Sequence, residues 1–439
     1  MVKRNVLKGM ILKMKKITTL ILVLALTLTC FAGCDKKETS SAGKVTLHIG
    51  LPGGDSLTPP ELIEEFEKAN PDIKITTDEA PWNNFRQKLD MQIGGNNAPD
   101  VFITDSGHAT SIASKGVLMD LSEKISENIN AEDYTSSLFA LKDAKGKVWG
   151  VPHAVNSVAL YYNEELFDKA GLEYPNENWT WDDMLSAAEK LTAPKDKSGI
   201  SSVYGFGLKE SITLGWYPVI LSTGGTPLNE DRTKSNFDDE KTIAGVKRFE
   251  KIAKSGVTPP LPWYATNGNI TAAFYQGKLA MTFLQSSSAP SIAENNPKLR
   301  FNVAAMPLGD DGVRHTIYVP NVWVVNGRSS KAKQEAAWKW LEFYLSEETQ
   351  LKLAEKRLGG YPIHKKALDY CDTLEGVPEN KAVFYKTIDE NAVTLSENAS
   401  WADWKAKTDS IFKDLYNGML SADEAAKKIH KEITIAIKG

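Results

Sequence analysis

The sequence has little cysteine, because Cys30, Cys34 and Cys371 are the only three among 439 residues. The first two fall at the end of a basic and then apolar N-terminal stretch, so Cys371 is alone in the rest of the chain. A lone cysteine cannot form an intramolecular disulfide, and Cys371 has no recognisable catalytic context. We expect a buried or inert role for Cys371.

The sequence also lacks the usual motifs of metal sites and enzymes. Its six histidines never fall two within one helical turn, and no HExxH, CxxC or P-loop pattern occurs. No G-x-S-x-G sequence is present for a serine hydrolase. We therefore predict no metal, no cofactor and no catalytic residue. A secreted carbohydrate-active enzyme stays open as an alternative, because a glycosidase needs only two facing carboxylates.

No apolar run in the sequence has the roughly 20 residues that a membrane-spanning helix needs. Residues 1–16 carry six basic side chains and no acid. The run that follows, from Ile17 to Leu28, is about a dozen residues long and apolar apart from its threonines. This pattern predicts a signal peptide over residues 1–33. Residues 34–43 are polar and without periodicity, which indicates a flexible tether.

The small residues before Cys34, Ala32 and Gly33, resemble the cleavage box of bacterial lipoproteins. The resemblance implies that Cys34 is diacylated and becomes the first residue of the mature chain. Two acyl chains anchor a protein stably at a membrane surface. The protein is therefore expected on the extracellular face of the cytoplasmic membrane, held there by its lipid anchor only.

The mature chain is expected to be acidic. The leader removes six of the 52 basic residues and none of the 56 acidic ones, which leaves 46 against 56 and a formal charge of −10. A chain of this charge is a poor nucleic-acid binder, because it cannot neutralise phosphates. Roughly 400 mature residues exceed what one hydrophobic core supports, so two lobes are expected.

Strand and helix patterns alternate through the first part of the mature chain, with short connections. Strands are predicted at Val45–Ile49, Ile73–Thr76 and Ala98–Thr104, and helices begin at Pro60 and Trp82. The alternation predicts an α/β fold with a mainly parallel sheet flanked by helices. Ligands of such sheets bind at the C-terminal ends of the strands. Asp55 and Asp105 lie at two of these predicted strand exits.

The stretch from Gly150 to Leu172 organises this pattern, because it predicts a long strand followed directly by a helix. Its strand is rich in β-branched and aromatic residues, while Asn163 and Gly171 are suited to begin and end a helix. We expect the chain to cross here from one lobe into a second. On the residues alone, an ordinary strand-to-helix unit inside a single sheet is an equal alternative.

The pattern V-P-x-x-x-N-x-x-x-L-Y-Y-N-x-x-L-F-x-x-A-G-L in this stretch resembles the hinge signature of family 1 extracellular solute-binding proteins, the sugar-binding lipoproteins of ABC importers. EEFEKANPDIKI, Gly224–Gly225 and the F-x-x-G-K-x-A-M run from Phe274 resemble further segments of that family, in the same order. The resemblance implies a two-lobe periplasmic-binding-protein type II fold. Its N-terminal lobe would comprise residues 44–153 and 308–365, and its C-terminal lobe residues 154–307 and 366–439.

The function implied by the resemblance is that of a substrate-binding subunit, a monomer and not an enzyme. It would capture a mono- or oligosaccharide between its lobes and deliver it to the permease subunits of an ABC transporter. A receptor of the same fold for a polyamine, a peptide or an organic anion stays open.

Aromatic residues are plentiful, with 11 Trp, 14 Tyr and 15 Phe, and flat indoles suit the C–H faces of sugars. Tryptophans at predicted loops and helix starts suit a binding site better than those within periodic helices, although a core position remains the alternative for each. With the strand-exit aspartate and the positions that the family resemblance aligns with ligand-contacting segments, the predicted ligand-binding residues are Asp55, Trp82, Asp105, Asn156, Trp216, Trp263, Gln285, Ser286, Asn321, Trp323 and Tyr361.

Overall fold

The computed structural model describes residues 44–52, 58–143, 145–356, 360–376 and 378–438. Its strands are β1 (Val45–Pro52), β2 (Ile73–Ala80), β3 (Val101–Asp105), β4 (Val151–Asn163), β5 (Tyr204–Gly207), β6 (Leu279–Gln285), β7 (Phe301–Ala304), β8 (Thr316–Val325) and β9 (Ala392–Val393). Its α-helices are α2 (Pro60–Ala69), α3 (Trp82–Gly94), α4 (Ser106–Ser114), α5 (Ser122–Asn128), α6 (Glu164–Ala170), α7 (Trp181–Leu191), α8 (Tyr217–Leu221), α9 (Glu240–Lys254), α10 (Trp263–Asn267), α11 (Ile270–Tyr275), α12 (Ser288–Asn295), α13 (Lys331–Leu345), α14 (Glu347–Lys356), α15 (Lys365–Thr373), α16 (Val383–Lys386), α17 (Ile388–Asn391), α18 (Trp401–Tyr416) and α19 (Ala422–Lys438). Short 3-10 or π-helical turns are η2 (Ala131–Asp133), η3 (Ser136–Phe139) and η4 (Ile212–Trp216).

The strands follow the order β2-β1-β3-β8-β4-β6-β5, with β7 added beside β4 and β9 beside β8. The pairs β1–β2, β1–β3 and β5–β6 are parallel, as the alternation of strands and helices predicts. The long strands β4 and β8 pair antiparallel with each other and with their other neighbours in this path. We call the part built on β1–β3 the first lobe and the part built on β5–β7 the second lobe.

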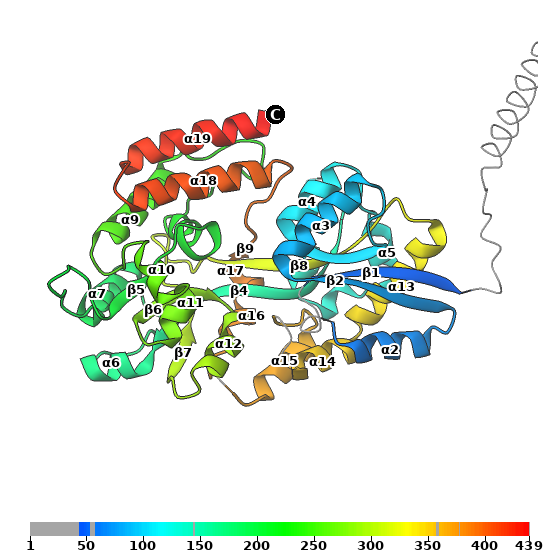
Figure 1. The fold of residues 1–439 in the computed structure, drawn as a ribbon, viewed down its shortest axis with the longest axis horizontal. Helices are drawn as coiled ribbons and strands as arrows, with labels where there is room; N and C mark the ends of the chain where they lie inside the picture. The colour runs from blue at the N-terminus through cyan, green and yellow to red at the C-terminus, as the bar shows by residue number, and fades with distance from the viewer. Residues whose placement is uncertain (1–43, 53–57, 144, 357–359, 377, 439) are drawn as a thin grey trace, which may run out of the picture. The chain divides into compact units, whose positions relative to one another are not determined.

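Strand β4 crosses from the first lobe to the second, and all 13 of its residues are buried. Its first half, from Val151 to Ser157, pairs with β8, and its second half pairs with β6 and β7. The strand-then-helix pattern predicted for this stretch is confirmed (Figure 1). The Asn163 side chain accepts a hydrogen bond from Leu166 N, which caps α6, and Gly171 ends that helix at a φ of 64°.

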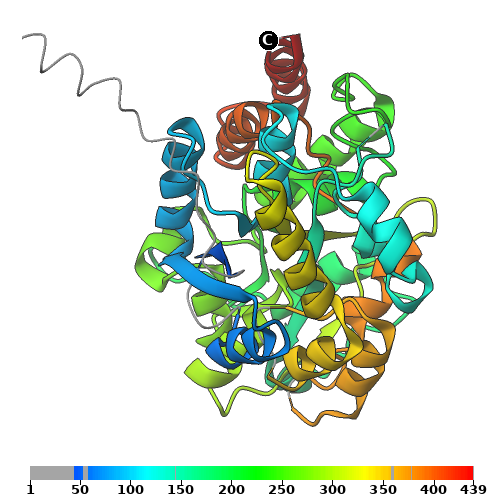
Figure 2. The same ribbon diagram turned by 90° about the vertical axis from the view of Figure 1, so that its right-hand side faces the viewer.

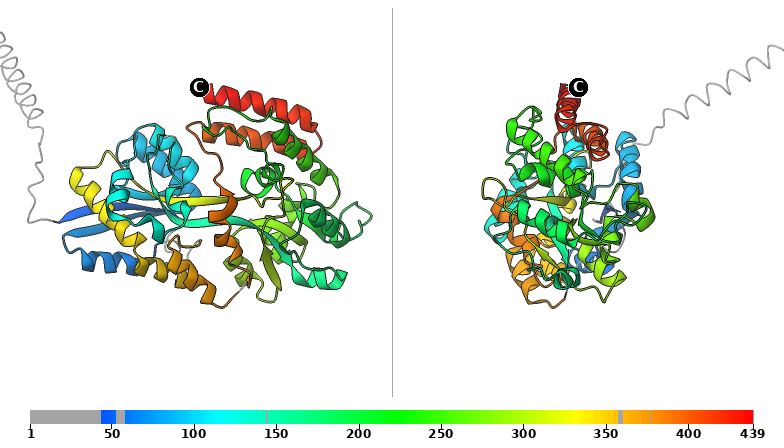
Figure 3. Two further views of the ribbon diagram at one scale, coloured as in Figure 1. Left: turned by 180° about the vertical axis from the view of Figure 1, so that it is seen from behind. Right: turned by 90° about the vertical axis from the view of Figure 1, so that its left-hand side faces the viewer.

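Helices lie outside the strands in each of the views (Figures 2 and 3). The long helices α18 and α19 form a pair beside α9 in the second lobe, whereas α3 and α4 belong to the first (Figure 1). Local signals fix several helix starts: Pro60 opens α2, and Thr180 with Asp183 forms a capping box at α7. None of the helices in the described part of the chain combines the length and apolar character that a bilayer crossing requires.

The hydrophobic core is continuous through the crossing strands. One cluster of buried side chains runs from Ile49 of β1 through Tyr161 of β4 to Phe274 of α11. A second cluster fills the second lobe around Trp216 and Phe412, and a smaller third one lies under α3 and α4. Cys371 of α15 is buried in the first cluster, in agreement with the role expected for it. This shared core indicates that β4 and β8 join the lobes as packed strands rather than as a loose linker.

Candidate ligand-binding site

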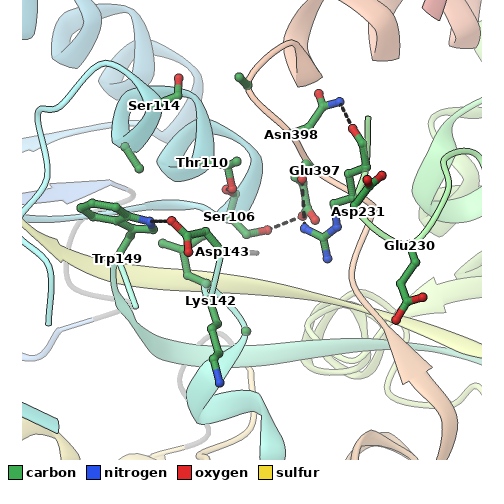
Figure 4. Close-up of a pocket in the computed structure, with 15 residues that line it drawn as sticks. Ser106, Thr110, Ser114, Lys142, Asp143, Trp149, Glu230, Asp231, Glu397 and Asn398 are labelled. Atoms are coloured by element: carbon green, nitrogen blue, oxygen red, sulfur yellow. Dashed lines mark hydrogen bonds between the residues drawn. The ribbon is translucent and has the colours of Figure 1, made fainter. Parts of the chain in front are cut away.

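A pocket of about 360 Å³ opens between α4 and the loop 140–143 of the first lobe and the segments 230–232 and 397–399 (Figure 4). We call it the interlobe pocket. It is lined by Ser106, Thr110, Ala113, Ser114, Ala140, Leu141, Lys142, Asp143, Trp149, Glu230, Asp231, Arg232, Glu397, Asn398 and Ala399. Its walls come from chain segments far apart in the sequence, so only the folded chain forms the pocket.

The first wall is the N-terminal turn of α4, which follows β3 without a connecting loop. Asp105 caps this helix: its Oδ1 accepts from His108 N at 2.9 Å, and its Oδ2 lies 3.4 Å from Arg86 Nη1. The next residue, Ser106, is buried and lines the pocket. The predicted strand-exit position of Asp105 is therefore confirmed, and its carboxylate is engaged within the first lobe.

The opposite wall is the segment that leads into α18. Glu397 is 3% exposed, and its Oε1 accepts from Ser106 Oγ at 2.5 Å across the opening between the lobes (Figure 4). Arg232 Nη1 donates to the main-chain oxygen of Glu397 at 2.9 Å, and Asn398 Nδ2 donates back to the Arg232 oxygen at 3.0 Å. Arg232 has a φ of 59°, a left-handed conformation that is strained for a side chain of this size. These contacts hold Glu397 at the pocket wall.

Trp149 supplies the aromatic surface of the interlobe pocket. Its Nε1 donates to Asp143 Oδ2 at 2.9 Å, and the main-chain N–H groups of Lys145 and Lys147 donate to Asp143 Oδ1. Partial burial raises the pKa of Asp143, but these hydrogen bonds outweigh it and leave the pKa below its ordinary value. The carboxylate fixes the edge of the indole, so the ring is held in one orientation.

Three predicted residues meet at the edge of β4, outside the interlobe pocket. Ser286 Oγ donates to Asn156 Oδ1 at 3.2 Å, and Tyr361 pairs with Val155 through main-chain hydrogen bonds in both directions. Ser286 and Tyr361 line a second, largely apolar pocket of about 270 Å³. We call Asn156, Ser286 and Tyr361 the hinge cluster, because they lie where β4 leaves the first lobe. Gln285, the last residue of β6, adjoins the cluster.

The remaining predicted residues are dispersed. Asp55 lies outside the described residues. Trp82 is half-buried at the start of α3, and Asn321 pairs with Asp105 and Ala154 within the sheet. Trp263 is nearly buried and lines a separate pocket with Pro260 and Pro262.

The expectation for Trp216 and Trp323 is corrected, because both side chains are fully buried. Trp216 stacks on Phe412 at 4.9 Å between ring centroids, and its Nε1 donates to Asp409. Trp323 packs against Trp340 in the first lobe. Helices later in the chain cover both indoles, so in this structure they are packing residues, and neither lines the interlobe pocket or the pocket beside the hinge cluster.

Sequence reasoning missed Ser106, Trp149, Arg232 and Glu397, which build the interlobe pocket. Ser106 directly follows a predicted strand exit, and this signal alone pointed to it. Within the described ranges, no group of three or more His, Cys, Asp or Glu side chains is arranged to hold a metal ion.

Comparison with known proteins gives a consistent result. A sequence model of the family described as bacterial extracellular solute-binding protein matches residues 54–351. A putative binding protein of Brucella abortus is 29% identical over 315 residues, which cover 71% of this chain and 74% of that protein. The sn-glycerol-3-phosphate-binding periplasmic protein UgpB of Escherichia coli K12 is 25% identical over 320 residues, covering 70% and 71%. The ABC substrate-binding protein Lmo0181 of Listeria monocytogenes, solved in complex with cycloalternan, superposes with a TM-score of 0.77 at 25% identity, covering 90% of this chain and 99% of that one.

Proposed function

Since the chain belongs to the bacterial extracellular solute-binding proteins, we propose that it captures a mono- or oligosaccharide between its lobes for an ABC importer. The observation that carries this proposal is the interlobe pocket, whose two walls meet through the hydrogen bond between Ser106 and Glu397. A ligand that touches both walls has more contacts when the lobes are together than when they are apart. Its binding therefore shifts the population toward the closed form, which a permease is built to recognise.

A carbohydrate suits the chemistry of the pocket. An ordered indole at Trp149 offers a flat apolar surface, while the Asp143, Glu397 and Asn398 side chains offer groups for hydroxyls. The Listeria protein with a similar fold was solved with cycloalternan, a saccharide. As further contacts we propose the hinge cluster of Asn156, Ser286 and Tyr361. The positions predicted from the sequence at Asp55, Trp82, Gln285 and Asn321 are part of the same proposal.

The cellular setting is part of the same proposal. Cys34 carries the lipid, the tether of residues 34–43 joins it to the folded part, and the protein acts as a monomer at the extracellular face of the cytoplasmic membrane. No covalent step is assigned to any residue, and the permease subunits are the protein partners. Nucleic acid is not proposed as a partner, because the acidic mature chain cannot neutralise its phosphates.

The proposal is tested by isothermal titration calorimetry of the purified protein against maltose, mannotriose, cycloalternan, glycerol 3-phosphate and spermidine. Glycerol 3-phosphate is included because UgpB is a relative. We expect binding of at least one saccharide, and no product when the same mixture is followed by chromatography. Binding of only the phosphate or the polyamine would contradict the carbohydrate assignment, and turnover of a saccharide would contradict a pure binding role.

A further inference from the structure

We propose that Glu397 is the ligand-selecting residue of the interlobe pocket: its carboxylate accepts hydrogen bonds from the hydroxyls of a neutral sugar and disfavours anionic solutes. This inference rests on the proposed function, and it names the group by which that site discriminates between classes of ligand.

The first argument is the unusual environment of this carboxylate. Glu397 is 3% exposed and lines the pocket. Its Oε1 accepts from Ser106 Oγ, whereas its Oε2 accepts no hydrogen bond from any of the described residues. Arg232 donates to the main-chain oxygen of Glu397, and no basic side chain in the described part of the chain forms an ion pair with the carboxylate.

A carboxylate in this position costs free energy unless donors satisfy it. Removing a charged group from water without full hydrogen bonding is unfavourable, so each further donor to this carboxylate stabilises it. Glu397 lines a pocket of about 360 Å³, so a ligand hydroxyl bound in the pocket can donate to its second carboxylate oxygen.

The second argument is the pairing of an acceptor with a donor at the same wall. A carboxylate only accepts hydrogen bonds, and the guanidinium of Arg232 only donates them. A hydroxyl both donates and accepts, so one sugar ring satisfies Glu397 and Arg232 together. An ammonium ion satisfies only the carboxylate, and a phosphate ester satisfies only the guanidinium.

The charges of the residues that line the interlobe pocket also favour a neutral sugar over an anionic ligand. Asp143, Glu230, Asp231 and Glu397 line the pocket against only Lys142 and Arg232, so acidic groups outnumber basic ones by four to two. An anionic ligand would approach this wall against like charges, whereas a neutral sugar would not.

The decisive variants are Glu397→Gln and, as a matched control, Ser106→Ala. Gln keeps the size of the side chain but replaces one acceptor oxygen with a donor nitrogen. Ser106→Ala removes the contact between the lobes while leaving the carboxylate in place. Hydrogen bonds to charged groups contribute about 1.5–3 kcal/mol, which corresponds to a loss of affinity of about tenfold or more.

Calorimetry with the saccharide that binds the wild-type protein is expected to show a loss of about tenfold or more for Glu397→Gln and a smaller loss for Ser106→Ala. Unchanged affinity in Glu397→Gln would overturn the role of Glu397 while leaving the proposed function standing. Equal losses in the two variants would also overturn it, because they would reduce Glu397 to a structural contact between the lobes. A wild-type protein that binds none of the saccharides would overturn the proposed function, and this inference with it.

A second measurement needs only the wild-type protein. The uronate counterpart of the bound saccharide, in which a carboxylate replaces a terminal CH₂OH group, is expected to bind about tenfold or more weakly. Equal or tighter binding of the uronate would overturn the inference, even if Glu397→Gln fails to fold.

Discussion

The indole of Trp401, the first residue of α18, lies directly against the main chain of Gly107 in α4. A β-carbon at Gly107 would lie 2.1 Å from Trp401 Nε1, well inside van der Waals contact. Trp401 packs edge-to-face on Trp404 at 4.8 Å between ring centroids and is 4% exposed, so the indole has little room to retreat. The missing side chain at position 107 therefore sets how closely the two lobes approach.

Gly107→Ala is expected to push the lobes apart and lower ligand affinity by about tenfold or more, because the bridging contacts need the close approach. Small-angle scattering should show a larger radius of gyration, and calorimetry the weaker binding. Gly94→Ala is the matched control, since a β-carbon at Gly94 in α3 meets nothing within 4 Å. Unchanged scattering and affinity in Gly107→Ala would show that the contact does not limit closure.

Trp216→Ala is expected to destabilise the fold by about 3–5 kcal/mol, the usual cost of emptying a large buried site. The stacked pair with Phe412 and the hydrogen bond to Asp409 are both lost in this variant. Urea unfolding measures the change. Trp149→Ala, at a half-buried position on the interlobe pocket, is expected to cost less stability. A larger loss of unfolding free energy in Trp149→Ala than in Trp216→Ala would contradict the assignment of Trp216 to the core.

Alkaline pH is expected to destabilise the protein partly through Tyr217. Burial raises the pKa of Tyr217 to about 12, although a hydrogen bond with Ser396 opposes this. An unfolded tyrosine has a pKa of about 10, so above that pH the unfolded chain loses its proton first and is favoured. The stabilisation that the protonated Tyr217 phenol gives the folded protein is therefore complete below pH 10 and is lost as the pH rises toward 12.

Tyr217→Phe removes this titration, so its free energy of unfolding should fall less steeply with pH. The difference from wild type is expected to build up to about 2–3 kcal/mol between pH 10 and pH 12. Urea unfolding at pH 8, 10, 11 and 12 provides the comparison. If the free energy of unfolding fell equally with pH in Tyr217→Phe and in the wild-type protein, a role for this phenol would be contradicted.

Cys34→Ser is expected to release the protein from membranes, because the proposed anchor is two acyl chains on this one cysteine. Fractionation of expressing cells should place the wild-type chain with membranes and the variant in the soluble extracellular fraction. A variant that stays with the membranes, or a wild-type chain that never reaches them, would contradict lipidation at this position.

Features that depend on a few neighbouring residues were readable from the sequence. The capping box of Thr180 and Asp183, the N-cap at Asn163 and the left-handed turn at Gly171 each close within one helical turn. The strand β4 was also predicted, because valines and aromatic residues recur through this stretch.

Whether a tryptophan is buried in the core or lines a pocket depends on the tertiary structure. Trp216 was predicted to bind ligand, yet it is covered by Phe412 and Asp409 of α18, nearly 200 positions later. Trp149, which the sequence analysis did not single out, lines a pocket. No local pattern distinguishes the two, because the burial of an indole depends on what packs over it.

The same holds for the interlobe pocket. Ser106 and Glu397 are 291 positions apart, and neither belongs to a motif, yet their side chains meet at 2.5 Å. The sequence by itself determined the main strands and helices and their order, because local backbone preference and apolar periodicity act over a few residues. The structure alone decided which polar groups share a wall, because that depends on how distant elements pack and on the absence of a side chain at Gly107.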